Sequence, residues 1–244
     1  MNQIVAIEDN FAPKDNWLRV EWNLGKRCNY DCSYCGIDLH DNHSTHMPLE
    51  KFNAAITQLI AIGKQQNKKV KISLTGGEPF VNPNILEMLK FGKESGIFKF
   101  SVTTNGSVPL DKYNKALDYI DYFIISYHFE FAFHEKVIHK IVELDRACKK
   151  RQQLGQNKNM HVHLMFLPGY LEQCKEIINI LNENNISYAV RRIRPQFDPN
   201  TKEYLLPNQS GAAGIPLYNM GKINQSNLKP YYSDEELIWL STVN

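Results

Sequence analysis

Three of the five cysteines in this chain fall within eight positions, and this cluster constrains the rest of the sequence more than any other feature. Cys28, Cys32 and Cys35 are spaced C-x3-C-x2-C. Iron–sulfur clusters are held by cysteine thiolates, and a four-iron cluster normally takes four of them. Three ligands would therefore leave one iron open to a different ligand. We expect the positive charges of Lys26 and Arg27 to favour thiolate over thiol at this loop.

A zinc site, or a turn without any metal, is the alternative interpretation of the cysteine loop. Zinc motifs usually pair one C-x2-C with a second Cys or His pair at a set distance. The chain has no second C-x2-C. Three histidines follow at His40, His43 and His46, but no ligand-spaced acid accompanies them, so a solvated loop is favoured there over a metal site. The cysteine spacing favours an iron–sulfur centre.

Length and composition exclude several classes of protein. A chain of 244 residues is long enough for one domain with a sizeable core, with or without an appendage. A net charge of +2 gives no strong bias toward nucleic acid. The N-terminus lacks a signal-peptide pattern, and no apolar stretch approaches the roughly 18 residues that span a bilayer. Clustered cysteines do not resemble a disulfide framework, so we expect a reducing, cytoplasmic setting. From the charge and the absence of a long apolar stretch, we expect neither a nucleic-acid partner nor a membrane partner.

Hydrophobic periodicity predicts strands that alternate with helices six times. This order indicates an α/β fold with a parallel sheet and right-handed crossovers. Six units are too few for the eight that close a TIM barrel, so we expect an open (β/α)6 partial TIM barrel. The predicted strands are 17–24, 70–74, 98–103, 122–127, 161–167 and 186–193, and the predicted helices are 48–63, 83–96, 110–119, 133–151 and 171–182.

The last fifty residues depart from this pattern. Pro195, Pro199, Pro207 and Pro216 mark a loop-rich segment. Ser233 and Glu236 form a capping-box sequence that predicts a short final helix. We therefore divide the chain into a partial-barrel core, 1–195, and a loop-rich C-terminal extension, 196–244, that packs on the core.

Polar and apolar residues alternate along several of the predicted strands. Parallel strands covered on both faces are usually apolar throughout. Alternation therefore predicts that one face of the sheet is covered by helices and that the other lines a polar, open lumen. Glu21, Ser73, Thr103 and His163 should point into the lumen, and the intervening Trp22, Ile72 and Val102 should point toward the helices.

Two further motifs follow the second and third strands. Gly76-Gly77-Glu78-Pro79 and Thr103-Thr104-Asn105-Gly106 lie downstream of the cysteine loop, each at the end of a strand. In this order the three motifs resemble those of the radical S-adenosylmethionine (radical SAM) superfamily, whose signature is C-x3-C-x-aromatic-C, with Tyr34 in the aromatic place. The resemblance covers residues 17–195 and implies the same open partial barrel.

The resemblance also implies cofactors and a reaction. Cys28, Cys32 and Cys35 would ligate three irons of one 4Fe–4S cluster, and the methionine end of SAM would bind the fourth iron. One electron from the cluster would cleave SAM to methionine and a 5′-deoxyadenosyl radical, which abstracts hydrogen from a substrate. We expect an unidentified small metabolite or peptide as substrate, and an electron donor such as a flavodoxin or ferredoxin.

Several residues are candidates for binding SAM, either by position in the motifs or by position at a strand end. Glu78 can accept hydrogen bonds from the SAM amine. Ser126 and His128 share a strand face, although a plain strand-end serine and a loop-capping histidine are the alternatives. Arg192 and Arg194 could hold the SAM carboxylate or an anionic substrate, or could form a solvated strand end. The full set of cofactor-binding candidates is Tyr34, Gly36, Ile37, Gly76, Gly77, Glu78, Pro79, Asn105, Ser126, His128, Arg192 and Arg194.

Cys148 and Cys174 are predicted to be structural. Each continues an apolar stripe at helical spacing, and a buried free cysteine behaves as a small hydrophobe. Many radical SAM relatives carry extra clusters in a cysteine-rich C-terminal domain, whereas no cysteine follows Cys174 here. Two alternatives to the enzyme remain open, which are a non-catalytic iron–sulfur or zinc-binding module and an N-terminal fragment of a larger radical SAM enzyme.

Overall fold

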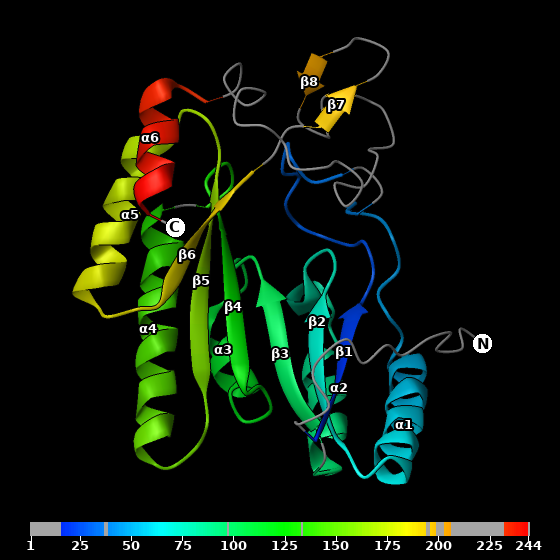
Figure 1. Ribbon diagram of the computed structural model, residues 1–244. Helices are drawn as coiled ribbons and strands as arrows, with labels where there is room; N and C mark the ends of the chain where they lie inside the picture. The colour runs from blue at the N-terminus through cyan, green and yellow to red at the C-terminus, as the bar shows by residue number, and fades with distance from the viewer. Residues whose placement is uncertain are drawn as a thin grey trace.

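The computed structural model describes residues 16–36, 39–96, 98–132, 134–193, 196–198, 203–205 and 232–243. Its centre is a six-stranded parallel sheet in which the strands follow chain order (Figure 1). Within the described residues the first and last strands do not pair with each other, so the expected open (β/α)6 partial barrel is confirmed. The strands are β1 (Trp17–Asn23), β2 (Lys69–Thr75), β3 (Phe98–Thr104), β4 (Tyr122–His128), β5 (Asn159–Phe166) and β6 (Tyr188–Arg192).

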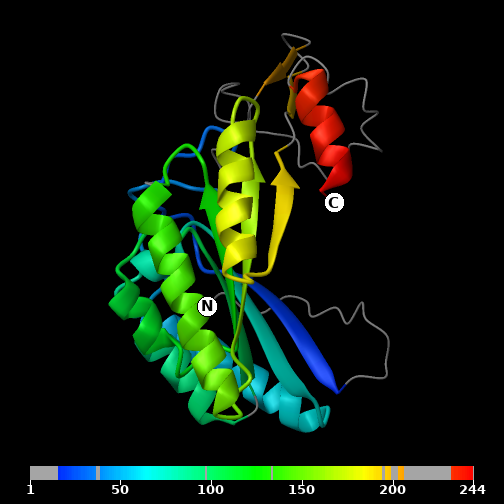
Figure 2. The same ribbon diagram turned by 90° about the vertical axis from the view of Figure 1, so that its left-hand side faces the viewer.

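The connecting helices gather on one face of the sheet (Figure 2). They are α1 (Leu49–Gln65), α2 (Ile85–Glu94), α3 (Leu110–Ala116), α4 (His134–Gln153) and α5 (Leu171–Glu183), with a short 3-10 turn, η1 (Pro79–Val81), before α2. Several predicted boundaries are wrong by two or three residues, among them the end of α3, at Ala116 where Tyr119 was predicted, and the starts of β5 and β6. Gly63 does not end α1 because it is buried within the helix, and the chain turns only at Asn67, which has φ of 51°. The helix α2 begins at Ile85 and not at the predicted residue 83, because Glu78 first caps the short turn η1.

The apolar half of each strand packs against these helices, as the alternation predicts. Ile72, Val102 and Leu164 are fully buried in the core. Trp22 stacks on Phe52 of α1 with ring centroids 4.8 Å apart. Each large side chain buried in this way contributes about 1.5–3 kcal/mol relative to an exposed one. The core therefore fixes the register, since a slip of one residue would turn the apolar set to the other face.

The opposite face carries the polar half of the strands. Glu21 pairs with Ser73, and Ser73 pairs in turn with Ser101. Ser126 pairs with His163 farther along the sheet. Among the described helices, none is long and apolar enough to cross a membrane.

Residues 232–243 of the extension contact the ends of β5 and β6. The antiparallel pair β7 (Gln196–Asp198) and β8 (Glu203–Leu205) precedes α6 (Asp234–Thr242). The predicted capping box is confirmed, since Ser233 Oγ accepts from the Glu236 amide at 3.2 Å and the Glu236 carboxylate accepts from the Ser233 amide at 2.8 Å. Tyr232 donates to the carbonyls of Phe166 and Ile193, which ties this helix to the ends of β5 and β6.

Candidate active site

A cavity of about 490 Å³ opens at the carboxyl ends of the strands. All three clustered cysteines line it, on a loop that follows β1. The other walls come from the strand ends, where active sites of such sheets form. These strand-end residues are Asn23, Thr75, Thr103, Thr104, Asn105, Ser126, His128 and Met165. Thr103 thus lies on the lumen side, as predicted, and Ser126, a candidate for binding the cofactor, lines the same cavity.

Backbone hydrogen bonds hold the first part of the cysteine loop. The Cys28 amide donates to the Asp41 carbonyl at 2.7 Å, and the Asp41 amide donates to the Lys26 carbonyl at 3.0 Å. The Arg27 guanidinium donates to the Ser44 carbonyl at 3.1 Å. The two ends of the loop, at residues 26–28 and 41–44, are therefore held together, and the three cysteines line the cavity.

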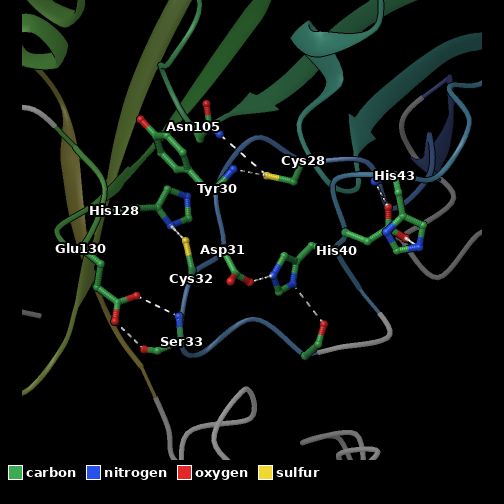
Figure 3. Close-up of polar contacts among 12 residues, drawn as sticks. Cys28, Tyr30, Asp31, Cys32, Ser33, His40, His43, Asn105, His128 and Glu130 are labelled. Atoms are coloured by element: carbon green, nitrogen blue, oxygen red, sulfur yellow. Dashed lines mark hydrogen bonds and ion pairs between the residues drawn. The ribbon is translucent and has the colours of Figure 1, made fainter.

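The second cysteine meets the end of β4 (Figure 3). The His128 Nδ1 atom lies 3.4 Å from the Cys32 Sγ atom. The same nitrogen forms a short hydrogen bond with the Tyr34 hydroxyl, and the two rings are stacked with centroids 5.9 Å apart. Tyr30 packs edge-on against His128. Burial lowers the pKa of His128 to about 4, so its ring is neutral at physiological pH.

Two further contacts fix the loop beyond Cys32. Glu130 accepts hydrogen bonds from the Ser33 amide at 2.9 Å and from the Ser33 hydroxyl at 2.5 Å. His40 bonds to the Asp31 carboxylate at 2.8 Å, and its Nδ1 atom lies 3.3 Å from the Gly36 carbonyl oxygen. His40 is therefore buried by its contacts with Asp31 and Gly36. The expectation of a solvated histidine loop is wrong for this residue.

The cysteines are thiols in the protein without metal, contrary to the expectation from Lys26 and Arg27. Burial raises the pKa of Cys32 to about 12 and that of Cys35 to about 11, and burial also raises the pKa of Cys28. Desolvation disfavours the charged form, and the neighbouring carboxylates act in the same direction. Binding of iron must therefore release protons from these sulfurs.

The two glycines of the second motif are required by the approach of the cysteine loop. Gly76 and Gly77 have φ values of 92° and 46°. A Cβ atom on Gly76 would lie 1.9 Å from Asn23 Oδ1, and one on Gly77 would lie 2.2 Å from the Arg27 carbonyl oxygen. The Glu78 amide donates to that same carbonyl at 2.9 Å. The glycine pair thus lets β2 lie directly against the segment that begins the cysteine loop.

The Glu78 carboxylate points into the protein and not into the large cavity. It accepts from the Phe80 amide at 2.9 Å, from the Thr104 hydroxyl at 2.7 Å and from the Asn105 amide at 2.6 Å. Burial raises its pKa to about 7. In this conformation Glu78 joins the end of β2 to the end of β3, and only the glycines of the motif line the cavity. Pro79 begins η1 and also lies outside the cavity lining.

Asn105 contacts the loop at the first cysteine. Its side-chain amide lies 3.9 Å from Cys28 Sγ and donates to Asn29 Oδ1 at 3.0 Å. The Tyr30 amide approaches the same sulfur at 3.4 Å. The end of β3 therefore supports Cys28 as the end of β4 supports Cys32.

The placement of Arg192 on the cofactor side is wrong. The register pairs Arg192 with Phe166, which is fully buried on the helix side, and pairs Arg191 with Met165, which lines the cavity. Arg191 is the lumen-side residue, and its guanidinium lies 3.3 Å from the His163 ring. Ile37 and Arg194 lie outside the described residues. Gly36 contacts His40 but does not line the cavity.

The arrangement of thiols suits a cluster better than a single metal ion. In the described part of the chain, no three Cys, His, Asp or Glu side chains are close enough to share one ion. A tetrahedral zinc site requires all its sulfurs within about 2.3 Å of the metal. A cluster distributes its thiolates over several irons. The three cysteines line one common cavity, which fits this second arrangement.

Sequence comparison agrees with the motifs and the fold. The family model of the radical SAM superfamily matches residues 22–183. The chain belongs to the radical SAM superfamily. The match includes the cysteine loop and runs through α5, so it covers most of the sheet and the cavity that we describe.

Curated relatives are similar to this chain over only part of their own length. A probable GTP 3′,8-cyclase of Methanocaldococcus jannaschii is 27% identical over 190 residues, which cover 72% of this chain and 60% of that protein. A GTP 3′,8-cyclase of Desulforamulus reducens is 36% identical over 103 residues, which cover 40% of this chain and 29% of that protein. The chain thus spans 60% or less of the length of these two relatives.

Solved structures share the fold at low sequence identity. A crystal structure of Streptococcus suis SuiB gives a TM-score of 0.54 at 18% identity, covering 77% of this chain and 42% of that chain. A second SuiB structure, bound to S-adenosylmethionine, gives a TM-score of 0.51 at 18% identity and covers 73% and 39% of the two chains. These likenesses support the partial-barrel architecture.

Proposed function

We propose that this chain is a radical SAM enzyme that holds one 4Fe–4S cluster through Cys28, Cys32 and Cys35 and binds SAM in the adjoining cavity. The observation that supports the proposal most is the convergence of the three thiols on one cavity at the carboxyl edge of the sheet. Three thiolates satisfy three irons and leave the fourth to another ligand. Family membership implies the same pair of cofactors.

The bound cofactors supply a reductive cleavage of the SAM sulfonium that gives methionine and a radical able to abstract hydrogen from a substrate. The chain supplies position and exclusion of water. The backbone of Gly76 and Gly77 lines the cavity without side chains and so permits a close approach of the methionine end. Ser126 and Asn23 offer hydrogen-bonding groups at the opposite strand ends.

The proposed substrate is a small metabolite or a peptide. GTP is the first compound to test, because several curated relatives are GTP 3′,8-cyclases. The electron donor would be a small redox protein such as a flavodoxin or ferredoxin, and the setting would be the cytoplasm.

Production of 5′-deoxyadenosine by the anaerobically reconstituted protein tests the proposal. With dithionite and SAM, the wild-type protein should form 5′-deoxyadenosine, and Cys28→Ala, Cys32→Ala and Cys35→Ala should each form none. Cys148→Ala and Cys174→Ala are the matched controls, since both thiols are buried in the core, and they should react as the wild type does. A wild-type protein that carries its cluster but leaves SAM intact would support the non-catalytic module instead.

A further inference from the structure

Residues at the end of β4 and in the turn that follows it face the cysteine loop. Ser126 and His128 line the cavity, and Glu130 accepts two hydrogen bonds from Ser33. Side chains two residues apart on a strand point to the same side. The end of β4 is therefore a support for the middle of the cysteine loop, and His128 is the member that touches a cysteine sulfur.

One hydrogen-bonding nitrogen of this support is within reach of the Cys32 sulfur. His128 Nδ1 lies 3.4 Å from the sulfur, and the same nitrogen hydrogen-bonds to the Tyr34 hydroxyl. Tyr34 stacks on His128. This stack and the edge contact from Tyr30 (Figure 3) fix the plane of the imidazole. No hydrogen bond reaches the Cys35 sulfur from the described residues, so the sulfurs have different surroundings.

We propose that His128 Nδ1–H donates a hydrogen bond to the Cys32 sulfur when the cluster is bound, and that this bond raises the reduction potential of the cluster. The inference rests on the proposed function, because it requires Cys32 to be a cluster ligand. In the neutral ring the proton then sits on Nδ1, where the Tyr34 oxygen and the Cys32 sulfur both accept from it, and Nε2 is left as the acceptor. His128 is a positioning residue in this role and not a ligand of iron.

The direction of the effect follows from charge. The reduced cluster carries one more negative charge than the oxidised cluster, and the thiolate sulfurs share it. A donor that points at a sulfur stabilises the reduced state more than the oxidised state. Hydrogen bonds to the sulfurs are among the factors that set cluster potentials, and partners of metal ligands commonly tune the metal in this way.

Substitutions at His128 can separate the hydrogen bond from the shape of the side chain. His128→Phe keeps a planar ring against Tyr34 but removes both nitrogens. His128→Asn keeps a donor near the position of Nδ1, whereas His128→Gln places its amide nearer the position of Nε2. His43→Phe is the matched control, since His43 is exposed on the segment beyond the cysteines.

The measurement is the midpoint potential of the reconstituted cluster, followed by electron paramagnetic resonance, with iron and sulfide per chain measured on the same samples. For His128→Phe we expect wild-type iron content and an equilibrium constant for reduction lowered about tenfold, which is about 59 mV more negative for one electron. His128→Asn should stay close to the wild type, His128→Gln should follow the phenylalanine variant, and His43→Phe should not change.

Each outcome distinguishes the inference from the proposed function. A wild-type protein without iron and sulfide would refute the proposed function itself. A loaded His128→Phe protein with the wild-type potential would overturn only the hydrogen bond. If His128→Phe fails to load, the asparagine and glutamine variants decide, because equal potentials in those two would also overturn the inference.

Discussion

Glu130 holds Ser33, a residue that lies 97 positions earlier in the chain and between the second and third cysteines. The carboxylate accepts from both the amide and the hydroxyl of Ser33, at 2.9 Å and 2.5 Å. The contact joins the cysteine loop to the end of β4, where no backbone ladder is present to do so. The geometry of the loop therefore depends on a side chain outside the three sequence motifs.

We expect Glu130→Ala to lower the free energy of unfolding of the iron-free protein by about 1.5–3 kcal/mol, as for loss of a hydrogen-bonded charged group. Iron should also leave the loaded variant faster, because Ser33 and the flanking Cys32 lose their support. Chemical denaturation and the rate of iron release to a chelator measure the two effects. Glu183→Ala, at an exposed position on α5, is the control. Equal iron-release rates in both variants would contradict the role of Glu130.

Gly77→Ala should destabilise the protein by more than the strain of a left-handed backbone conformation at that residue, because the added methyl group would also displace the cysteine loop. The new Cβ atom would lie 2.2 Å from the Arg27 carbonyl oxygen, next to Cys28. Gly155→Ala is the matched control, since Gly155 also has positive φ, 77°, but has nothing within 4 Å of the added carbon. The control should cost about 1–2 kcal/mol of unfolding free energy from the left-handed conformation.

Thermal or chemical unfolding compares the two alanine variants, and iron content after reconstitution reports on the site. Gly77→Ala should be less stable than Gly155→Ala and should bind less iron. Similar losses of stability, with full iron content in both, would mean that the loop accommodates the methyl group.

The buried Glu78 carboxyl makes stability depend on pH. Its pKa in the folded protein is about 7 against an ordinary 4.5, so the folded state holds this proton over a range where the unfolded state has lost it. Stability from this group is therefore present in full below pH 4.5 and is lost as pH rises to about 7. Above that range the buried charge costs on the order of 3 kcal/mol.

Glu78→Gln removes the titration. The difference in unfolding free energy, wild type minus variant, should fall as pH rises from 4.5 to 7 in the iron-free protein. Urea denaturation at several pH values measures this difference. A difference that stays constant would show that Glu78 ionises at its ordinary pKa, and one that rises with pH would show that its pKa in the folded protein is lowered; either result would contradict the raised pKa.

Much of the fold was predictable because its signals are local. Apolar periodicity and the alternation in the strands depend on residues close together in sequence, and the fully buried Ile72, Val102 and Leu164 confirm the predicted faces. The cysteine loop, the glycine pair and Asn105 are sequence motifs, and each follows a strand whose end meets the same cavity.

The contacts that position the cysteines were not predictable in the same way. His40, Glu130 and the inward turn of Glu78 depend on which distant groups fill the space beside them. The error at Arg192 could have been avoided. Val190 is apolar and should face the helices, where it is indeed buried, and Arg192 lies two positions on and so shares that face. Glu130 lies two residues past the end of β4, in a turn, where strand alternation gives no prediction.

Cys148 and Cys174 lie in the core, with 2% and 0% of their surfaces exposed. Cys148→Ala and Cys174→Ala should each lower the free energy of unfolding by about 1 kcal/mol, as for a small core truncation. Iron and sulfide per chain should not change, because neither thiol lines the cavity. Loss of iron in either variant, or about eight irons per chain in the wild type against the four of one cluster, would contradict a single-cluster protein.

The most direct test of the central claim is the electron paramagnetic resonance spectrum of the reduced, reconstituted protein before and after addition of SAM. If Cys28, Cys32 and Cys35 ligate three irons of one cluster, the fourth iron has no cysteine and is open to SAM. We predict the signal of one reduced 4Fe–4S cluster, a clear change in its g values when SAM is added, and no such signal in Cys32→Ala. A cluster signal that SAM leaves unchanged, or a spectrum without a cluster signal, would contradict the proposed function.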